Sequence, residues 1–321
     1  MRQENIPEQW TVWLKQMDDW ITEYHPGTTD RSHRNYRSTA IAILRLLDAY
    51  GLPQDPKKLG PKEFNDFYNI LMERKYAVST GRNYEYVFQL YVKSSGNEGL
   101  KDRKLAWQPD KRPNVDWLTP EETVRLLEAP LNPEQRMLVH LELCMGLRRI
   151  DSIRLRKEFI DWTHEKLHVL GKGHGNGKER DVDFAESSER PSMDTRTVFQ
   201  EYLDYRTAMV KTTQARNGST ADPEKLLIYS TGNELGSFSE DGVAIDNRMK
   251  EISRLVGIEF SNHTLRRTFG RSLYECGCKI EDIAAIMGHD DPKMTFKYLG
   301  LDRVDHKKDM KKLDFWRLQN N

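Results

Sequence analysis

Apolar residues recur at helical spacing through most of this chain, and that periodicity limits the folds open to it more than any other feature. In the N-terminal part, four separate stretches with this spacing occupy residues 10–21, 36–50, 61–72 and 79–93. Short amphipathic helices in succession are typical of a small bundle in which the apolar faces meet. We therefore predict a helical domain over residues 1–95.

One pair of segments downstream follows a different pattern. Residues 166–170 and 179–184 alternate apolar with polar side chains around a glycine-rich turn, which predicts a β-hairpin, and a further short strand is predicted at 226–229. Helical patterns occupy most of the remaining chain, starting from a capping box at Thr119–Glu122. The predicted fold is mainly α with a small β-sheet, built as a helical N-terminal domain followed by a C-terminal α+β domain. Further helices are expected at 133–145, 196–214, 241–256, 264–276, 280–287 and 292–299.

Two segments lie outside these two domains. Residues 96–116 combine glycines and prolines with several lysines and arginines, which predicts an interdomain linker basic enough to lie along a phosphate backbone, although the same composition suits a plain solvated connector. Residues 303–321 place apolar side chains among lysines, which predicts a tail helix after the C-terminal domain at 117–302. Because those apolar side chains are costly to expose, we expect this helix to dock on a neighbouring protomer.

Composition excludes several classes of protein. The 321 residues carry 50 Lys+Arg and 50 Asp+Glu, so any nucleic-acid surface must be a local patch. Three cysteines without a CxxC pair exclude a disulfide framework and a zinc finger. No apolar run approaches the ~18 residues that span a membrane, and the first residues contain no signal-peptide apolar region. We expect a cytoplasmic protein with no membrane association.

Cations follow a turn signal at two places in the first half of the C-terminal domain. Arg148 comes just after the glycine that ends an apolar helix, where its guanidinium could hold a phosphate with Asp151 placed to orient it. A surface Arg–Asp helix pair would give the same pattern. In the glycine-rich hairpin turn, Lys172 or Lys178 could swing toward a ligand, and an exposed turn with solubilising lysines is the alternative.

Imidazoles and a phenol follow in the last third of the chain. His263 and Arg266 are three residues apart and share a helix face, which we expect to point out of the core near a helix N-terminus, where anions bind. A helix-capping histidine beside a surface arginine is the alternative. His289 follows Gly288 at the end of another helix, and Tyr298 lies nine residues further on. A core tyrosine is the more common role for such a side chain.

The order and spacing of these residues resemble those of one family. The sequences LTPEE, GLRRIDSIRL, HTLRR and IMGH, together with Tyr298, resemble the boxes of the tyrosine recombinase (phage integrase) family, whose members include Xer-type resolvases and viral and plasmid integrases. The resemblance covers roughly residues 117–300. The helical first domain is similar in length and helix content to the SAM-like core-binding domain of the family. The matching site residues are Arg148, Lys172, His263, Arg266, His289 and Tyr298.

The resemblance implies a site-specific DNA recombinase or integrase that needs no metal, no other cofactor and no ATP. Tyr298 would attack a DNA phosphodiester and form a 3′-phosphotyrosyl link. The two arginines and His289 would bind the nonbridging oxygens of the phosphate. His263 would take the proton of the tyrosine, and Lys172 would protonate the leaving 5′ oxygen.

The same resemblance implies the partners of the protein. These are double-stranded DNA with a specific recombination site and three further copies of the chain, in a homotetramer that acts on two duplexes. The protein would be nucleoid-associated and of prokaryotic, viral or plasmid origin. The alternatives are a catalytically silent DNA-binding accessory protein of the same fold, a type IB topoisomerase-like enzyme that relaxes supercoils as a monomer, and a histidine-rich metalloenzyme. The sequence disfavours the last, because no HExxH or comparable spacing occurs.

Overall fold

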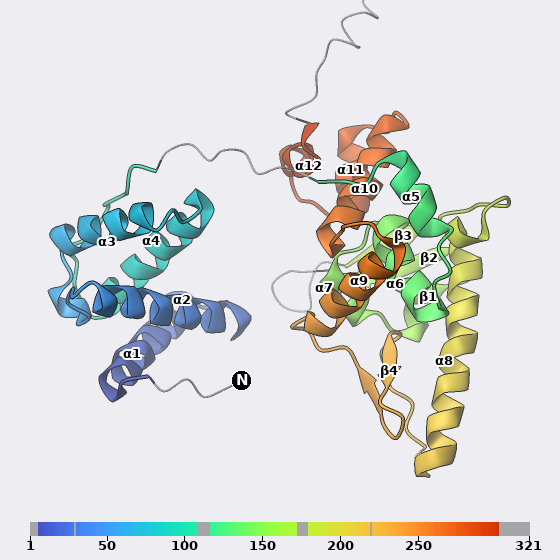
Figure 1. Cartoon of the computed structure of the whole chain (residues 1–321), viewed down its shortest axis with the longest axis horizontal. Coiled ribbons are helices and arrows are strands. Elements are labelled where there is room, and N and C mark those ends of the chain that lie inside the picture. The colour runs from blue at the N-terminus through green and yellow to red at the C-terminus, as the bar shows by residue number, and fades with distance from the viewer. Residues whose placement is uncertain (1–5, 29, 108–115, 172–178, 219, 302–321) are drawn as a thin grey trace, which may run out of the picture. The chain divides into compact units, whose positions relative to one another are not determined.

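The structure is a computed structural model that describes residues 6–28, 30–107, 116–171, 179–218 and 220–301. The chain divides into two compact units, Met1–Pro113 and Asn114–Asn321. Figure 1 shows the helices and strands of each unit. Compactness by itself assigns no role, so the functional domain boundaries given above stay a prediction. The predicted tail helix at 303–321 lies outside the described residues.

The first unit is helical. Its described residues form α1 Glu8–Tyr24, α2 Asp30–Ala49, α3 Pro61–Glu73 and α4 Val78–Lys93, with a 3₁₀ turn at Pro56–Lys58. The first helix shows why this sequence forms a bundle, because its buried side chains are three or four residues apart and therefore lie on one face. These side chains are Trp10, Leu14, Met17 and Ile21. The helices predicted for the N-terminal part are confirmed.

Part of the predicted linker packs against the first unit. Leu105 and Trp107 lie against its core, where Glu85 accepts hydrogen bonds from the Leu105 N–H at 2.8 Å and from the Trp107 indole N–H at 2.5 Å. Gly81 on α4 makes this possible, since a Cβ there would overlap the indole ring. Residues 108–115 of the predicted linker lie outside the described residues.

The second unit is mostly helical with small antiparallel sheets, so the predicted fold class is confirmed. The α-helices of its described residues are α5 Pro120–Leu127, α6 Pro133–Leu143, α7 Arg149–Arg154, α8 Thr195–Asn217, α9 Val243–Val256, α10 Asn262–Glu275, α11 Ile280–Met287 and α12 Pro292–Tyr298. The strands are β1 Ile160–Asp161, β2 Lys166–Leu170, β3 Glu179–Asp183, β4 Ile228–Ser230 and β5 Leu235–Ser237, and 3₁₀ turns occupy Lys157–Phe159 and Pro191–Met193. Helix α7 and strands β1 and β5 were not predicted. None of the described helices is both long enough and apolar enough to cross a membrane.

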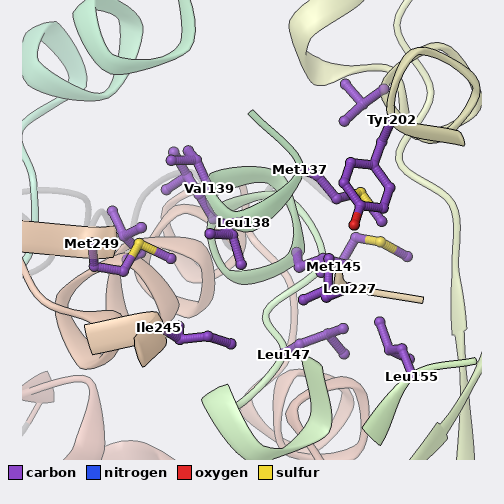
Figure 2. Close-up of a cluster of buried hydrophobic side chains, with 14 of the residues drawn as sticks. Met137, Leu138, Val139, Met145, Leu147, Leu155, Tyr202, Leu227, Ile245 and Met249 are labelled. Atoms are coloured by element: carbon purple, nitrogen blue, oxygen red, sulfur yellow. The ribbon is translucent and has the colours of Figure 1, made fainter. Parts of the chain in front are cut away.

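Helix α6 lies at the centre of the second core. It packs against α8, α9 and α10, and Figure 2 shows its side chains Met137, Leu138 and Val139 among those of the neighbouring helices. Tyr202 of α8 is fully buried beside it. Its hydroxyl donates to the Leu226 carbonyl at 3.1 Å and accepts a hydrogen bond at 3.1 Å from the N–H of Ile228, the first residue of β4, so the polar atom is satisfied inside the core.

The three-stranded sheet has the order β1–β2–β3, and its strands are antiparallel. The register pairs Leu167 with Val182 and Val169 with Arg180. Leu167, Val169 and Val182 are all buried, so these pairs lie on the inner face of the sheet. The side chain of Arg180 therefore lies on the inner face of β3.

Candidate active site

A glycine turn places Arg148 at the start of α7. Gly146 has φ +62°, a left-handed conformation that favours glycine, and it reverses the chain after α6. Arg148 is the N-cap residue of α7, and its backbone N–H donates to Oδ2 of Asp151 at 3.0 Å. Its guanidinium donates to the Gly288 carbonyl at 2.6 Å. Arg148 is therefore held against the end of α11.

Helix α10 brings His263 and Arg266 to the same place. The helix begins at a Ser261 cap. Arg266 is only 3% exposed, and its guanidinium donates to the carbonyls of Gly146 and Met287. The prediction that this face points out of the core is wrong for Arg266. The carbonyl acceptors that this buried guanidinium needs come from the turn just after α6 and from the last residue of α11.

His289 emerges at the end of α11. Gly288 has φ +64° and turns the chain, so that the His289 N–H donates to the Ala284 carbonyl at 2.8 Å. The imidazole lies between two side chains. Its Nδ1 is 2.7 Å from Oγ1 of Thr295, and its Nε2 is 3.2 Å from Nη2 of Arg266. An imidazole and two guanidiniums therefore meet where α11 ends.

Tyr298 is the last residue of α12. Its Oη is 3.4 Å from Nδ1 of His263 and 3.4 Å from the carbonyl oxygen of the same residue. Its ring centroid is 5.4 Å from that of His289, and the guanidinium carbon of Arg267 lies 5.1 Å from the ring centroid. The structure thus brings five of the six predicted site residues together. Their catalytic roles stay a prediction.

The sixth residue is in the hairpin turn. Lys172 and its alternative Lys178 both lie outside the described residues, so the assignment of the lysine also stays a prediction. The flanking strands pair as far as Leu170 and Glu179. The Gly171 carbonyl accepts a hydrogen bond from Arg154 of α7 at 3.2 Å. Gly171 therefore lies beside α7, the helix whose N-cap is Arg148.

An ion pair near the site was missed. Asp151 was expected to orient the side chain of Arg148, but its carboxylate binds only the backbone N–H of that residue and pairs instead with Arg180, at 2.8 Å. Asp151 is fully buried, and the side chain of Arg180 is 13% exposed. Arg180 also lies close to Gly288, where a Cβ would be 3.1 Å from its Nη1. The sequence could have indicated that Arg180 is partly buried, because it lies two residues before Val182 and therefore on the same face of β3.

Burial controls the protonation of the site. It raises the pKa of Tyr298 and lowers that of His263. Burial and the nearby positive charge of Arg266 lower the pKa of His289 to about 4. Burial, followed by the positive charge of Arg148, lowers the pKa of Arg266 to about 10. At neutral pH the phenol is therefore protonated, both imidazoles are neutral and the guanidinium is charged. Among the described residues, no three His, Cys, Asp or Glu side chains are grouped so that they could hold a metal ion.

A second acidic residue in this region was also missed. Glu142 of α6 is 1% exposed, and neither of its carboxylate oxygens has a hydrogen-bond partner among the described residues. Burial raises the pKa of Glu142 well above its usual range, more than the charge of Arg266 lowers it. Burial therefore favours the protonated, neutral form of this carboxyl group. Its signal in the sequence is a glutamate inside the mostly apolar stretch 133–145.

Comparison with known proteins agrees with this geometry. The model of the phage integrase family matches residues 116–303, which is more than half of the chain. The tyrosine recombinase XerC of Pelobacter propionicus is 29% identical over 191 residues, covering 57% of this chain and 55% of that protein. XerC of Roseiflexus sp. is 25% identical over 248 residues, covering 72% and 71%. The chain thus spans little more than half the length of the first of these relatives.

Solved structures share the fold. The Tn1549 transposon integrase in complex with transposon right end DNA has a TM-score of 0.65 at 16% identity, covering 96% of this chain and 99% of that chain. A lambda integrase tetramer bound to a Holliday junction has a TM-score of 0.63 at 18% identity, covering 90% and 76%. The family match and the shared fold lead to one conclusion: this chain belongs to the phage integrase family of tyrosine recombinases.

Proposed function

We propose that this protein is a site-specific DNA recombinase or integrase that cuts and rejoins DNA through a 3′-phosphotyrosyl intermediate, without metal or ATP. The observation that carries the proposal is the convergence of Tyr298, two imidazoles and two guanidiniums from four separate chain segments. A phosphodiester suits this set. It is anionic, its nonbridging oxygens need hydrogen-bond donors, and its phosphorus reacts with an oxygen nucleophile.

The first step is attack by the Tyr298 oxygen on phosphorus. The phenol starts protonated because burial raises its pKa, so it needs a base. His263 is neutral and its Nδ1 is 3.4 Å from the phenol oxygen, so it takes the proton as the Oη–P bond forms. The positive charges of Arg266 and Arg267 partly oppose this rise in the pKa of Tyr298 and stabilise the developing phenolate.

The two arginines and His289 stabilise the charge on the nonbridging oxygens. Within the described residues, Arg148 makes one side-chain hydrogen bond to a protein acceptor and Arg266 makes three, fewer than a guanidinium can donate. Donors are therefore left for phosphate oxygens. Because both guanidiniums are held by helix-end carbonyls before substrate arrives, little reorganisation accompanies the reaction.

The leaving group completes the step. The bond between phosphorus and the 5′ oxygen breaks, and that oxygen takes a proton from Lys172, giving a 5′-hydroxyl and a phosphotyrosyl ester. The phosphotyrosyl link is itself a phosphodiester, so the bond energy is conserved. The 5′-hydroxyl of a partner strand can therefore attack it and restore the DNA without ATP. Metal is not needed in this scheme, since arginines carry the positive charge.

The proposed partners are double-stranded DNA with a specific recombination site and, in a homotetramer on two duplexes, further copies of this chain. The complexes of the structural relatives with DNA, and the lambda integrase tetramer on a Holliday junction, support this assembly. We assign DNA binding to residues 1–95 and 96–116 and catalysis to 117–302, with 303–321 docking on a neighbouring protomer. Such a substrate places the protein at the nucleoid.

A covalent-adduct assay tests the proposal. The protein is incubated in EDTA with a pool of nicked suicide duplexes that carry randomised central sequences, and adducts are resolved on denaturing gels. We expect an adduct with the native chain, none with Tyr298→Phe, and a large loss with Arg148→Ala. Tyr274→Phe on α10 removes a hydroxyl from the same unit and is the matched control, so its adduct should persist.

Each other outcome points to an alternative. Retention of duplex DNA without any adduct would indicate a catalytically silent DNA-binding protein. An adduct on any nicked sequence, with relaxation of supercoils by the monomer, would indicate a topoisomerase-like enzyme. A requirement for a divalent metal would contradict the proposed chemistry.

A further inference from the structure

Thr295 of α12 contacts the ring of His289, one of the candidate site residues. It is fully buried in α12, three residues before Tyr298, so the two side chains lie on adjoining parts of one helix face. Its hydroxyl oxygen is 2.7 Å from Nδ1 of His289. One hydrogen bond thus joins the helix of the proposed nucleophile to the imidazole that follows α11.

The contacts of the His289 ring assign its proton. A guanidinium has only donors, so the 3.2 Å contact between Nη2 of Arg266 and Nε2 of His289 requires that Nε2 accept. The ring proton is then on Nδ1, which donates to the Thr295 hydroxyl. The lowered pKa of His289, about 4, keeps the ring neutral at neutral pH. The charged and titratable groups facing this ring are Arg266 of α10, Arg148 before α7, Arg180 of β3, Asp290 and Tyr298.

This arrangement does not suit an anion. Without its proton, Nε2 presents a lone pair, which repels a phosphate oxygen. To bind that oxygen the ring needs a proton on Nε2, and Nδ1 then becomes an acceptor that requires a donor. A threonine hydroxyl is both a donor and an acceptor, so it can serve Nδ1 in either state, whereas a valine of the same shape can serve neither.

We propose that Thr295 is a positioning residue that lets the His289 imidazole move its ring proton from Nδ1 to Nε2 without changing its orientation. In the arrangement described, Nδ1 donates to the hydroxyl and Nε2 accepts from Arg266. When a phosphate binds, one proton leaves Nδ1 for water and one proton from water binds Nε2, so the ring stays neutral. The hydroxyl rotates and donates to Nδ1, while Nε2 and the released N–H of Arg266 both donate to the phosphate. The identity of this anion rests on the proposed function.

Two variants separate the hydroxyl from the shape of the side chain. Thr295→Val keeps the branched volume and loses the hydroxyl, and Thr295→Ser keeps the hydroxyl. The first measurement is ¹⁵N NMR of the histidine rings in the full chain without DNA, with the His289 signal assigned by its loss in His289→Gln. We expect the Nδ1–H tautomer in the native chain and in Thr295→Ser. In Thr295→Val the Nδ1–H loses its acceptor while Arg266 still faces Nε2, so neither tautomer satisfies both ring nitrogens and we expect a clear shift away from the Nδ1–H tautomer. An unchanged tautomer in a folded Thr295→Val protein would overturn the inference.

The second measurement is the rate of adduct formation. We expect Thr295→Val to be slower by about tenfold or more and Thr295→Ser to recover most of that loss, with duplex binding unchanged, since the hydroxyl acts on a hydrogen bond made to the reacting phosphate. A native rate in Thr295→Val would overturn the inference and leave the proposed function standing. If the native chain forms no adduct at all, the proposed function fails, and the NMR result alone decides whether Thr295 sets the tautomer of His289.

Discussion

Replacing Arg180 by glutamine removes the charge partner of a carboxylate that has no access to solvent. Asp151 is fully buried, and its Oδ2 accepts hydrogen bonds from Arg180 at 2.8 Å and from the backbone N–H of Arg148 at 3.0 Å. The other carboxylate oxygen, Oδ1, has no partner among the described residues. Arg180→Gln therefore leaves a buried carboxylate whose remaining hydrogen-bond donor among the described residues is one backbone N–H, with the charges of Arg148 and Arg266 still acting on it.

The structure sets the size of the effect. Removing one partner of a buried ion pair costs about 3–5 kcal/mol, because the remaining charge stays desolvated without its direct ion-pair partner. In a unit of roughly 200 residues, 1 kcal/mol lowers the melting temperature by about 2–4 °C. We therefore expect Arg180→Gln to lower the Tm of the second unit by about 6–20 °C. Since Asp151 also holds the backbone N–H of Arg148 at the N-terminus of α7, adduct formation should fall as well.

Urea unfolding at 25 °C and calorimetry of the full chain measure this loss. The matched control is Arg196→Gln. That arginine pairs with Glu165 at 2.7 Å, but both side chains are well exposed, so its loss should cost no more than about 1 kcal/mol. The double variant Arg180→Gln/Asp151→Asn removes both charges and should recover most of the stability. A loss in Arg180→Gln no larger than in the control, or a double variant as unstable as the sum of its two single variants, would refute the reasoning.

Two further predictions concern the C-terminal end of α6 and the turn that follows it. Because the pKa of Glu142 is raised, the folded chain keeps a proton that the unfolded chain loses near pH 4.5, so the free energy of unfolding should fall as pH rises above that value. Glu142→Gln should flatten this slope in urea titrations between pH 5 and 9. Equal slopes in the two proteins would contradict the assignment. Gly146→Ala forces a Cβ onto the Phe269 ring at φ +62° and should cost well over 1 kcal/mol in the same unfolding experiment. Gly257→Ala, at φ +66° with open space around the Cβ, should cost only about 1 kcal/mol, and similar losses at the two glycines would show that the ring contact is unimportant.

Sequence patterns predicted the long elements well and the short ones poorly. Helices such as α2, α8 and α9 repeat their apolar spacing over several turns, which is enough for periodicity to be read. Helix α7 has six residues and strand β1 has two, so neither completes a pattern. Such short elements form because neighbouring parts of the chain accept their hydrogen bonds, as β2 does for β1.

The candidate site also combines features that the sequence determined with features that only the tertiary structure decided. By itself, the sequence determined which residue types follow each helix end, because glycine turns, caps and apolar spacing are local properties. Only the tertiary structure decided that Arg266 is buried, since its carbonyl partners lie 120 and 21 residues away in sequence. It also decided that Asp151 pairs with Arg180 rather than with the side chain of Arg148. A buried charge takes whichever partner the packing of distant segments brings within reach, and no local pattern records that choice.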